Sequence, residues 1–242
     1  RVAIAKEPTA LSPIVIFGTN AEIANTTQTF MQDKDENIWV GTINGLYVYT
    51  HASHHGMTQM RASSEDKSLS TNIISVIHIT SSGQVWIGTA QGINRLYKKE
   101  GKTLFQTYFD NTNKQFFVDN NRIQMIEEAG KGKFLVSTKY HLRFFDPVTG
   151  TFSREQAIDS VCSLYGMRFV RSYCKDTKGN IWMAFNEGGV GVWIDSTQTF
   201  EHLDWPNYQP DIHRTIFRAK DGSVWVGSDT QGLWRLSVSD DL

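Results

Sequence analysis

Apolar and polar residues alternate in short runs along most of the chain, and this period of two is typical of β-strands. One six-residue segment recurs five times, at residues 37–42, 84–89, 133–138, 180–185 and 223–228. Its third residue, the anchor, is Trp39, Trp86, Leu135, Trp182 or Trp225, so successive anchors are 47, 49, 47 and 43 residues apart. Repeats of about 40–50 residues with four strands each are typical of propeller blades.

Each repeat predicts four antiparallel strands joined by tight turns. A glycine lies three residues before the anchor in every repeat except the first, where Glu36 takes its place, and glycine allows positive φ in such turns. We expect the anchor tryptophans to pack between blades rather than to form a sugar-stacking surface. The predicted fold is all-β: one β-propeller domain over residues 1–242 with five four-stranded blades. Its repeats cover about 25–64, 72–110, 121–155, 167–205 and 211–242.

The last repeat supplies only three strands, and an unassigned apolar strand lies at residues 13–17. We predict that residues 13–17 pair with the strand around residues 233–236 and complete the last blade. This arrangement closes the ring and removes the exposed sheet edges that an open ring would leave. The alternative is that the five blades belong to a larger ring.

Composition excludes several classes of protein. The chain has 242 residues, 40% of them hydrophobic, and 24 basic against 25 acidic residues give a net charge of −1. This balance argues against disorder and against a nucleic-acid partner. No apolar run approaches the roughly 20 residues of a membrane-spanning helix, so we expect no membrane segment here. The chain begins with Arg1, which indicates a removed leader or a piece of a longer protein.

The repeat resembles that of the two-component regulator propellers. Their pattern joins an Asn and an aliphatic residue, an Asp, a Gly-x-Ile/Val-Trp-Ile/Val-Gly-Thr segment and a Gly-Leu/Ile-x-x-Tyr/Leu segment. The clearest copies are residues 72–96 and 32–49, and the third repeat departs from the pattern with Leu135 for Trp and His141 for Gly. The resemblance implies the periplasmic sensor region of hybrid two-component or diguanylate cyclase receptors, several of which recognise oligosaccharides.

Polar residues recur at two fixed distances before the anchor. Fourteen residues before it lie Asn25, Asn72, Asn121, Arg168 and Asp211; eleven residues before it lie Gln28, Ser75, Gln124, Arg171 and Arg214. Positions twelve and nine residues before the anchor are mostly apolar and should face the neighbouring sheets, so the polar set should face the channel. The alternative is an ordinary solvent-lined strand surface, with the asparagines acting as turn residues.

These positions predict a ligand site at the mouth of the central channel. Amides suit hydroxyl-rich sugars, and guanidinium groups bind carboxylate or phosphate bidentately. An acidic sugar or another small anion is therefore the more particular expectation. The predicted ligand-binding residues are Arg171, Arg214, Arg168, Gln28, Gln124, Asn25, Asn72 and Asn121.

The remaining motifs indicate little chemistry. His51, His54 and His55 lie in a polar connection with no acidic ligand nearby, so we expect a solvated loop rather than a zinc site. Cys162 and Cys174 are 12 residues apart, and a disulfide and a pair of free thiols remain equally open. Since the sequence contains neither a phosphate-binding loop nor a nucleophile elbow, we predict a non-enzyme without cofactor or metal.

The register and the resemblance together favour a non-catalytic extracytoplasmic sensor. It would lie in the periplasm as a domain of a membrane-anchored receptor and bind a small ligand, such as an oligosaccharide or an acidic sugar. Any catalytic output module would lie outside this segment, and a homodimer formed through the parent receptor is a further expectation. A protein-interaction scaffold is the first alternative, and a lyase or glycan-processing propeller is the second.

Overall fold

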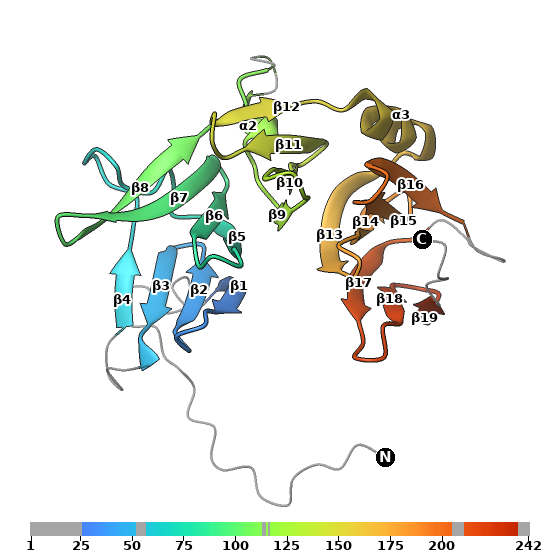
Figure 1. Cartoon of the computed structure of the whole chain (residues 1–242), viewed down its shortest axis with the longest axis horizontal. Helices are drawn as coiled ribbons and strands as arrows, with labels where there is room; N and C mark the ends of the chain where they lie inside the picture. Colours follow the sequence, from blue (N-terminus) through green and yellow to red (C-terminus); the bar gives the residue numbers. More distant parts are fainter. Residues whose placement is uncertain (1–25, 52–56, 113–114, 116, 205–210, 237–242) are drawn as a thin grey trace, which may run out of the picture.

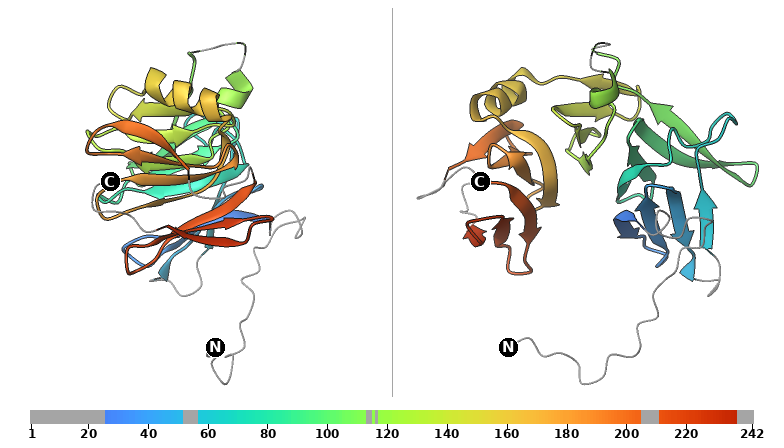
Figure 2. Two further views of the ribbon diagram at one scale, coloured as in Figure 1. Left: turned by 90° about the vertical axis from the view of Figure 1, so that its right-hand side faces the viewer. Right: turned by 180° about the vertical axis from the view of Figure 1, so that it is seen from behind.

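The computed structural model describes residues 26–51, 57–112, 115, 117–204 and 211–236. Within these residues the chain forms five antiparallel sheets that follow one another around an open arc, with the first strand of each sheet on the inside (Figure 1). The view from behind shows the same opening between the first and the last sheet (Figure 2). No helix in the described part is long and apolar enough to cross a membrane.

Neighbouring strands in each sheet are also neighbours in sequence. The first sheet contains β1 (Thr27–Gln32), β2 (Ile38–Thr42), β3 (Gly45–Tyr49) and β4 (Met57–Met60). The second contains β5 (Ile74–Ile79), β6 (Val85–Thr89), β7 (Gly92–Lys99) and β8 (Lys102–Tyr108). The third contains β9 (Met125–Glu128), β10 (Phe134–Ser137), β11 (Leu142–Asp146) and β12 (Thr151–Ser153). The fourth contains β13 (Arg168–Lys175), β14 (Ile181–Glu187), β15 (Val190–Ile194) and β16 (Thr199–Leu203), and the fifth β17 (His213–Arg218), β18 (Val224–Ser228) and β19 (Leu233–Leu236).

In the described part of the chain, two helices connect sheets on the outside of this repeat. α2 (Phe117–Asn120) precedes β9, and α3 (Gln156–Tyr165) joins β12 to β13. The pattern of alternating residues did not predict α3, which ends at Gly166 in the left-handed conformation, with φ of 65°. The all-β prediction therefore holds for the sheets and misses a helix between the third and the fourth sheet.

The turn before each anchor strand has the predicted backbone. Gly83, Gly179 and Gly222 have φ of 85°, 93° and 87°, and Glu36 adopts φ of 61° in the same place. Glycine relieves the crowding that a Cβ atom meets in this left-handed region, and Glu36 tolerates it only because the surrounding hairpin fixes the turn.

Aspartates cap two of these turns and bind the anchor tryptophans. Asp33 accepts hydrogen bonds from the amide of Asn37 at 2.9 Å and from the indole of Trp39 at 2.8 Å. Asp176 accepts a hydrogen bond from the indole N–H of Trp182 at 2.9 Å. Partial burial raises the pKa of Asp33, but hydrogen bonds from Trp39, Asn37 and Asp35 outweigh it and hold the pKa below its ordinary value. The capped form is therefore the carboxylate.

The hydrophobic core lies between consecutive sheets, as predicted for the anchors. Trp39, Trp86 and Trp182 are at most 9% exposed, and each belongs to a cluster that its own sheet shares with the next one. The apolar positions twelve and nine residues before an anchor are buried too, as Ile74 and Ile77 show. The expectation that these positions face neighbouring sheets is confirmed.

Both ends of the arc expose residues whose counterparts are buried elsewhere. Phe30 is 75% exposed, whereas Ile77 and Ile216, at the same distance from their anchors, are at most 4% exposed. At the other end, Leu233 is 64% exposed, while its counterpart Leu46 is fully buried. Since Leu46 and Ile77 pack in one cluster, Phe30 and Leu233 mark two matching faces, each without a neighbouring sheet in the described part of the chain.

The last sheet has three strands in the described part of the chain, and the other four sheets have four. The strand expected at residues 13–17 lies outside the described residues. Closure of the ring by that strand therefore stays a prediction.

Candidate ligand-binding site

The residue eleven places before the anchor lies at a β-bulge in the innermost strand of four sheets. In each of these sheets the pairing between the first and the second strand shifts at this residue, which is Gln28, Ser75, Arg171 or Arg214. In the third sheet, Gln124 directly precedes β9, and its backbone N–H donates a hydrogen bond to the carbonyl oxygen of Ser137 at 2.8 Å. A bulge leaves its extra residue unpaired and redirects that side chain. Equal spacing in sequence thus corresponds to one structural position around the arc.

Arg171 is held by neutral groups. Its Nε and one terminal nitrogen donate to Oδ1 of Asn186 at 2.9 and 2.7 Å, and its guanidinium carbon lies 4.7 Å from the centre of the Phe169 ring. Phe169 has φ of 60°, which is unusual for a bulky residue and is the kind of backbone strain that functional sites tend to hold. Among the described residues, no carboxylate forms an ion pair with Arg171, so its positive charge is not neutralised by direct contact.

Arg214 differs, because Asp229 neutralises it. The guanidinium donates to both carboxylate oxygens of Asp229, at 2.5 and 2.7 Å. This hydrogen bond is the main reason why the pKa of Arg214 is raised and that of Asp229 lowered, and the charge of Arg171 also lowers the pKa of Asp229. The sequence predicted the same anion-binding role for both arginines, but of the two only Arg171 lacks a carboxylate partner among the described residues.

Two asparagines fourteen residues before their anchors form hydrogen bonds to backbone groups of nearby connections. Asn72 accepts the amide of Ala62 at 2.8 Å. Asn121 is 1% exposed, accepts the amide of Asp110 at 2.7 Å and donates to the carbonyl of Phe117 at 2.8 Å. These contacts match the alternative in which the asparagines are turn residues. We therefore remove Asn72 and Asn121 from the ligand-facing set.

The other predicted residues have varied surroundings. Gln28 is exposed on β1, and Asn25 lies outside the described residues. Oε1 of Gln124 is buried without a hydrogen-bond partner among the described residues. Arg168, at the start of β13, is exposed and lines a cleft beside α3 rather than sharing the contacts of Asn72 and Asn121.

Sequence reasoning missed the partners of the arginines. Asn186 and Asp229 both lie four residues after their anchors, opposite the bulge of the same hairpin. The register that identified Arg171 and Arg214 would have identified these partners too, if the positions after the anchor had been compared. Phe169 gave no such signal, because its contact depends on an unusual backbone conformation.

The cysteine and histidine motifs also have clear surroundings. Cys162 and Cys174 are free and half-buried, and burial raises their pKa values to about 12 and about 11. They pack against different hydrophobic clusters.

Nε2 of His51 lies 3.2 Å from Oε2 of Glu36, which corrects the expectation that no acidic group is near it. His54 and His55 lie outside the described residues. Among the described residues, no group of three or more His, Cys, Asp or Glu side chains is placed to hold a metal ion.

Known structures resemble this fold. No family model and no curated protein sequence matches the chain. The extracellular domain of BT3049 from B. thetaiotaomicron, described as a hybrid two-component system, aligns over 96% of this chain with 23% identity and a TM-score of 0.70. The WD40 propeller domain of Doa1 covers 87% with 14% identity and a TM-score of 0.56, and virginiamycin B lyase from Staphylococcus aureus covers 88% with 13% identity and a TM-score of 0.57.

These likenesses confirm the propeller fold and the predicted resemblance in fold to sensor propellers. The chain spans 29% of the BT3049 domain, 63% of the Doa1 domain and 70% of the lyase. Since the identities are 13–23%, these likenesses show the fold alone, and function must be argued from the site.

Proposed function

We propose that this chain is a non-catalytic, extracytoplasmic sensor domain of a bacterial signalling receptor, and that it binds a small ligand at the mouth of its central channel. The ligand class is an oligosaccharide with an acidic group, or another small anion. The receptor would be membrane-anchored, and its output module would lie outside this segment. The likeness to the extracellular domain of BT3049 supports the sensor role.

One observation carries the ligand class: Arg171 lies at an inner-strand bulge, and its contacts with described side chains are to neutral groups, Asn186 and Phe169. A guanidinium group that folding has not paired with a carboxylate retains its attraction for an anion. Arg214 and Asp229 lie at the equivalent bulge of the next sheet as an ion pair. They supply both donors and acceptors, which suits a ligand that carries hydroxyl groups beside its acidic group.

A thermal-shift screen with neutral and acidic oligosaccharides tests this function. A ligand that binds the folded chain raises its Tm in a concentration-dependent way. We expect acidic oligosaccharides to do so, and Arg171→Ala to weaken binding about tenfold or more, because charge-assisted hydrogen bonds are lost. The Tm of the unliganded variant should match the parent, since Arg171 lies on the exposed surface.

Arg235→Ala is the matched control, because Arg235 is also exposed, donates to Asp221 at 3.1 Å and lies over an aromatic ring, that of Trp225, at 5.8 Å. It should retain full affinity. Equal loss of affinity in the two variants, or a screen in which only neutral sugars raise the Tm, would refute the anionic ligand class.

A protein-interaction scaffold is the second candidate, favoured by the apolar side chains exposed at the ends of the arc. Phe30, Phe217 and Leu233 are 75%, 62% and 64% exposed. A scaffold would show no small-molecule stabilisation in the screen. The likeness to virginiamycin B lyase concerns the fold alone, and a lyase would be recognised by metal-dependent turnover.

The architecture of the complete ring is part of the proposal. The three-stranded fifth sheet supports the addition of residues 13–17 as its fourth strand, because the other described sheets each have four. A ring of five blades closed in this way would bring the Phe30 and Leu233 faces together. A larger ring would instead cover each face with a further blade.

A further inference from the structure

A cleft of about 500 Å³ lies beside α3, where the third sheet gives way to the fourth. Its walls come from the turn between β10 and β11, from α3 and from the start of β13. An adjoining hollow of about 10 Å³ is lined largely by apolar and aromatic side chains, including Leu142, Met167, Phe169 and Phe185. The residues that line the cleft include Tyr140, Leu142, Arg154, Asp159, Met167 and Arg168.

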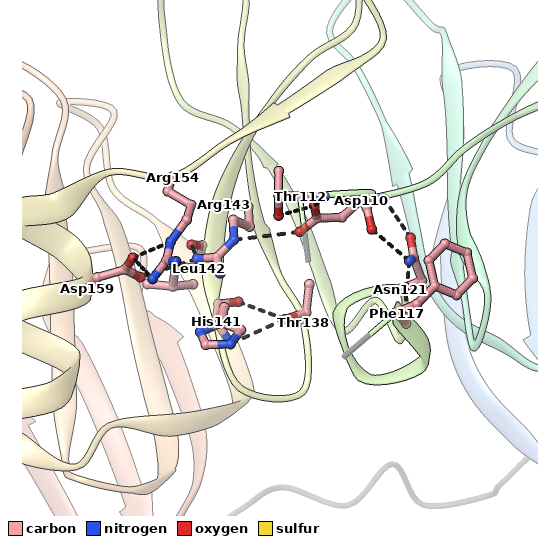
Figure 3. Close-up of polar contacts among 10 residues, drawn as sticks. All are labelled: Asp110, Thr112, Phe117, Asn121, Thr138, His141, Leu142, Arg143, Arg154 and Asp159. Carbon is pink, nitrogen blue, oxygen red and sulfur yellow. Dashed lines mark hydrogen bonds and ion pairs between the residues drawn. The ribbon is translucent and has the colours of Figure 1, made fainter. Parts of the chain in front are cut away.

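A row of alternating charges runs from the third sheet to the edge of the cleft and fixes α3 to that sheet (Figure 3). Arg143 is 3% exposed and lies between two carboxylates: its Nε is 3.6 Å from Oδ2 of Asp110, and one terminal nitrogen donates to Oδ1 of Asp159 at 3.2 Å. Arg154 then binds the other oxygen of Asp159 through Nε at 2.9 Å and a terminal nitrogen at 2.8 Å. Asp159 thus holds Arg154 at the edge of the cleft.

The wall and the cleft carry an excess of one positive charge. The guanidinium groups of Arg154 and Arg168 and the carboxylate of Asp159 line the cleft, and Arg143 and Asp110 are buried beside it as an ion pair. The guanidinium group of Arg168 forms no hydrogen bond or ion pair with any described residue, and the second terminal nitrogen of Arg154 has no partner among them either. Burial, followed by the nearby charge of Arg143, lowers the pKa of His141, so the imidazole is neutral at neutral pH. The excess charge therefore belongs to Arg168.

We propose that this cleft binds a small carboxylic acid with an apolar body. The carboxylate accepts hydrogen bonds from Arg168 and from the unpaired nitrogen of Arg154, and the body rests on Leu142 and Met167 beside the ring of Tyr140. One excess positive charge matches a monoanion better than a phosphate dianion, and the apolar floor offers few partners to a hydroxyl-rich sugar. Arg171 does not line this cleft, and the inference goes beyond the proposed function.

Met167 supplies a local probe for the test. The chain contains six methionines, so methyl-labelled methionine gives a simple NMR spectrum in which Met167→Leu identifies the cleft signal. Phenylacetate and phenethyl alcohol are matched probes that share the ring and differ in the carboxylate. We expect phenylacetate to shift the Met167 signal saturably and phenethyl alcohol to bind at least about tenfold more weakly.

Substitutions then identify the anion-binding group. Arg168→Ala should weaken phenylacetate binding about tenfold or more, and Arg168→Lys should recover part of it. Arg61→Ala, which removes an exposed arginine that directly follows β4, should leave the affinity unchanged. Since Arg168 is exposed and without a described partner, its variants should melt at the parent temperature.

Four results would overturn the proposal. They are equal affinity for the acid and the alcohol, unchanged affinity in Arg168→Ala, tighter binding of phenylphosphonate than of phenylacetate, and tighter binding of glucuronate at the Met167 signal. The phosphonate result would indicate a dianion site. The glucuronate result would indicate a sugar site that extends from the channel mouth.

Discussion

Replacing Trp86 with alanine removes the largest side chain between the second and the third sheet. The indole is 2% exposed, and its centre lies 5.2 Å from the ring of Phe134 and 5.5 Å from that of Phe145. A buried tryptophan removes about 200 Å² from water, which at about 25 cal/mol per Å² corresponds to about 5 kcal/mol. Measured aromatic truncations in cores cost about 3–5 kcal/mol, so we expect Trp86→Ala to lower the free energy of unfolding by about that amount.

Urea unfolding followed by circular dichroism measures this loss, because the signal does not depend on the tryptophan removed. Trp225→Ala is the matched control: Trp225 holds the same place in the last sheet but is only half-buried, and its indole donates to Ser223 at 3.0 Å. It should cost clearly less. Trp86→Phe, which keeps a ring in the core, provides a measurable value if the alanine variant unfolds. Equal losses in Trp86→Ala and Trp225→Ala would refute the packing argument.

Two further predictions concern the first sheet and the ring. The pKa of Asp33 is lowered by folding, so its stabilisation is present above its ordinary pKa of 3.8 and is lost as the pH falls through the folded value. The urea midpoint of Asp33→Asn should therefore lie furthest below the parent's near pH 7, with the gap narrowing at acid pH; a constant gap contradicts this. If five blades close the ring, Phe30→Cys with Leu233→Cys, in a background with both native cysteines changed to serine, should form an intramolecular disulfide on mild oxidation. Two free thiols would instead favour the larger ring.

The blade repeat could be predicted from the sequence because each blade is built from the same contacts between residues that are close together in the chain. The turn glycines, the capping aspartates and the buried anchors depend on residues within about six positions of one another, and the chain displays them directly. The bulge position could be predicted for the same reason. Equal spacing from an anchor corresponds to an equal place on the inner strand.

The rest depends on contacts that the repeat does not encode. α3 lies between two repeats, where the length of the connection varies and no period applies. Arg143 meets Asp110 and Asp159, which are 33 residues before it and 16 after it, so no local pattern could pair them. Asp229 differs, because it lies at a fixed distance after its anchor, so the repeat does place it opposite Arg214.

Hydrogen–deuterium exchange with and without a saturating acidic oligosaccharide from the screen tests the central claim most directly. Ligand contact at the channel mouth should slow exchange in peptides that cover the starts of β13 and β17, which carry Arg171 and Arg214. Peptides from the outer strand β16 should exchange at the same rate in both states. Slower exchange confined to β16 and the other outer strands would contradict a channel-mouth site and would place the ligand on the rim.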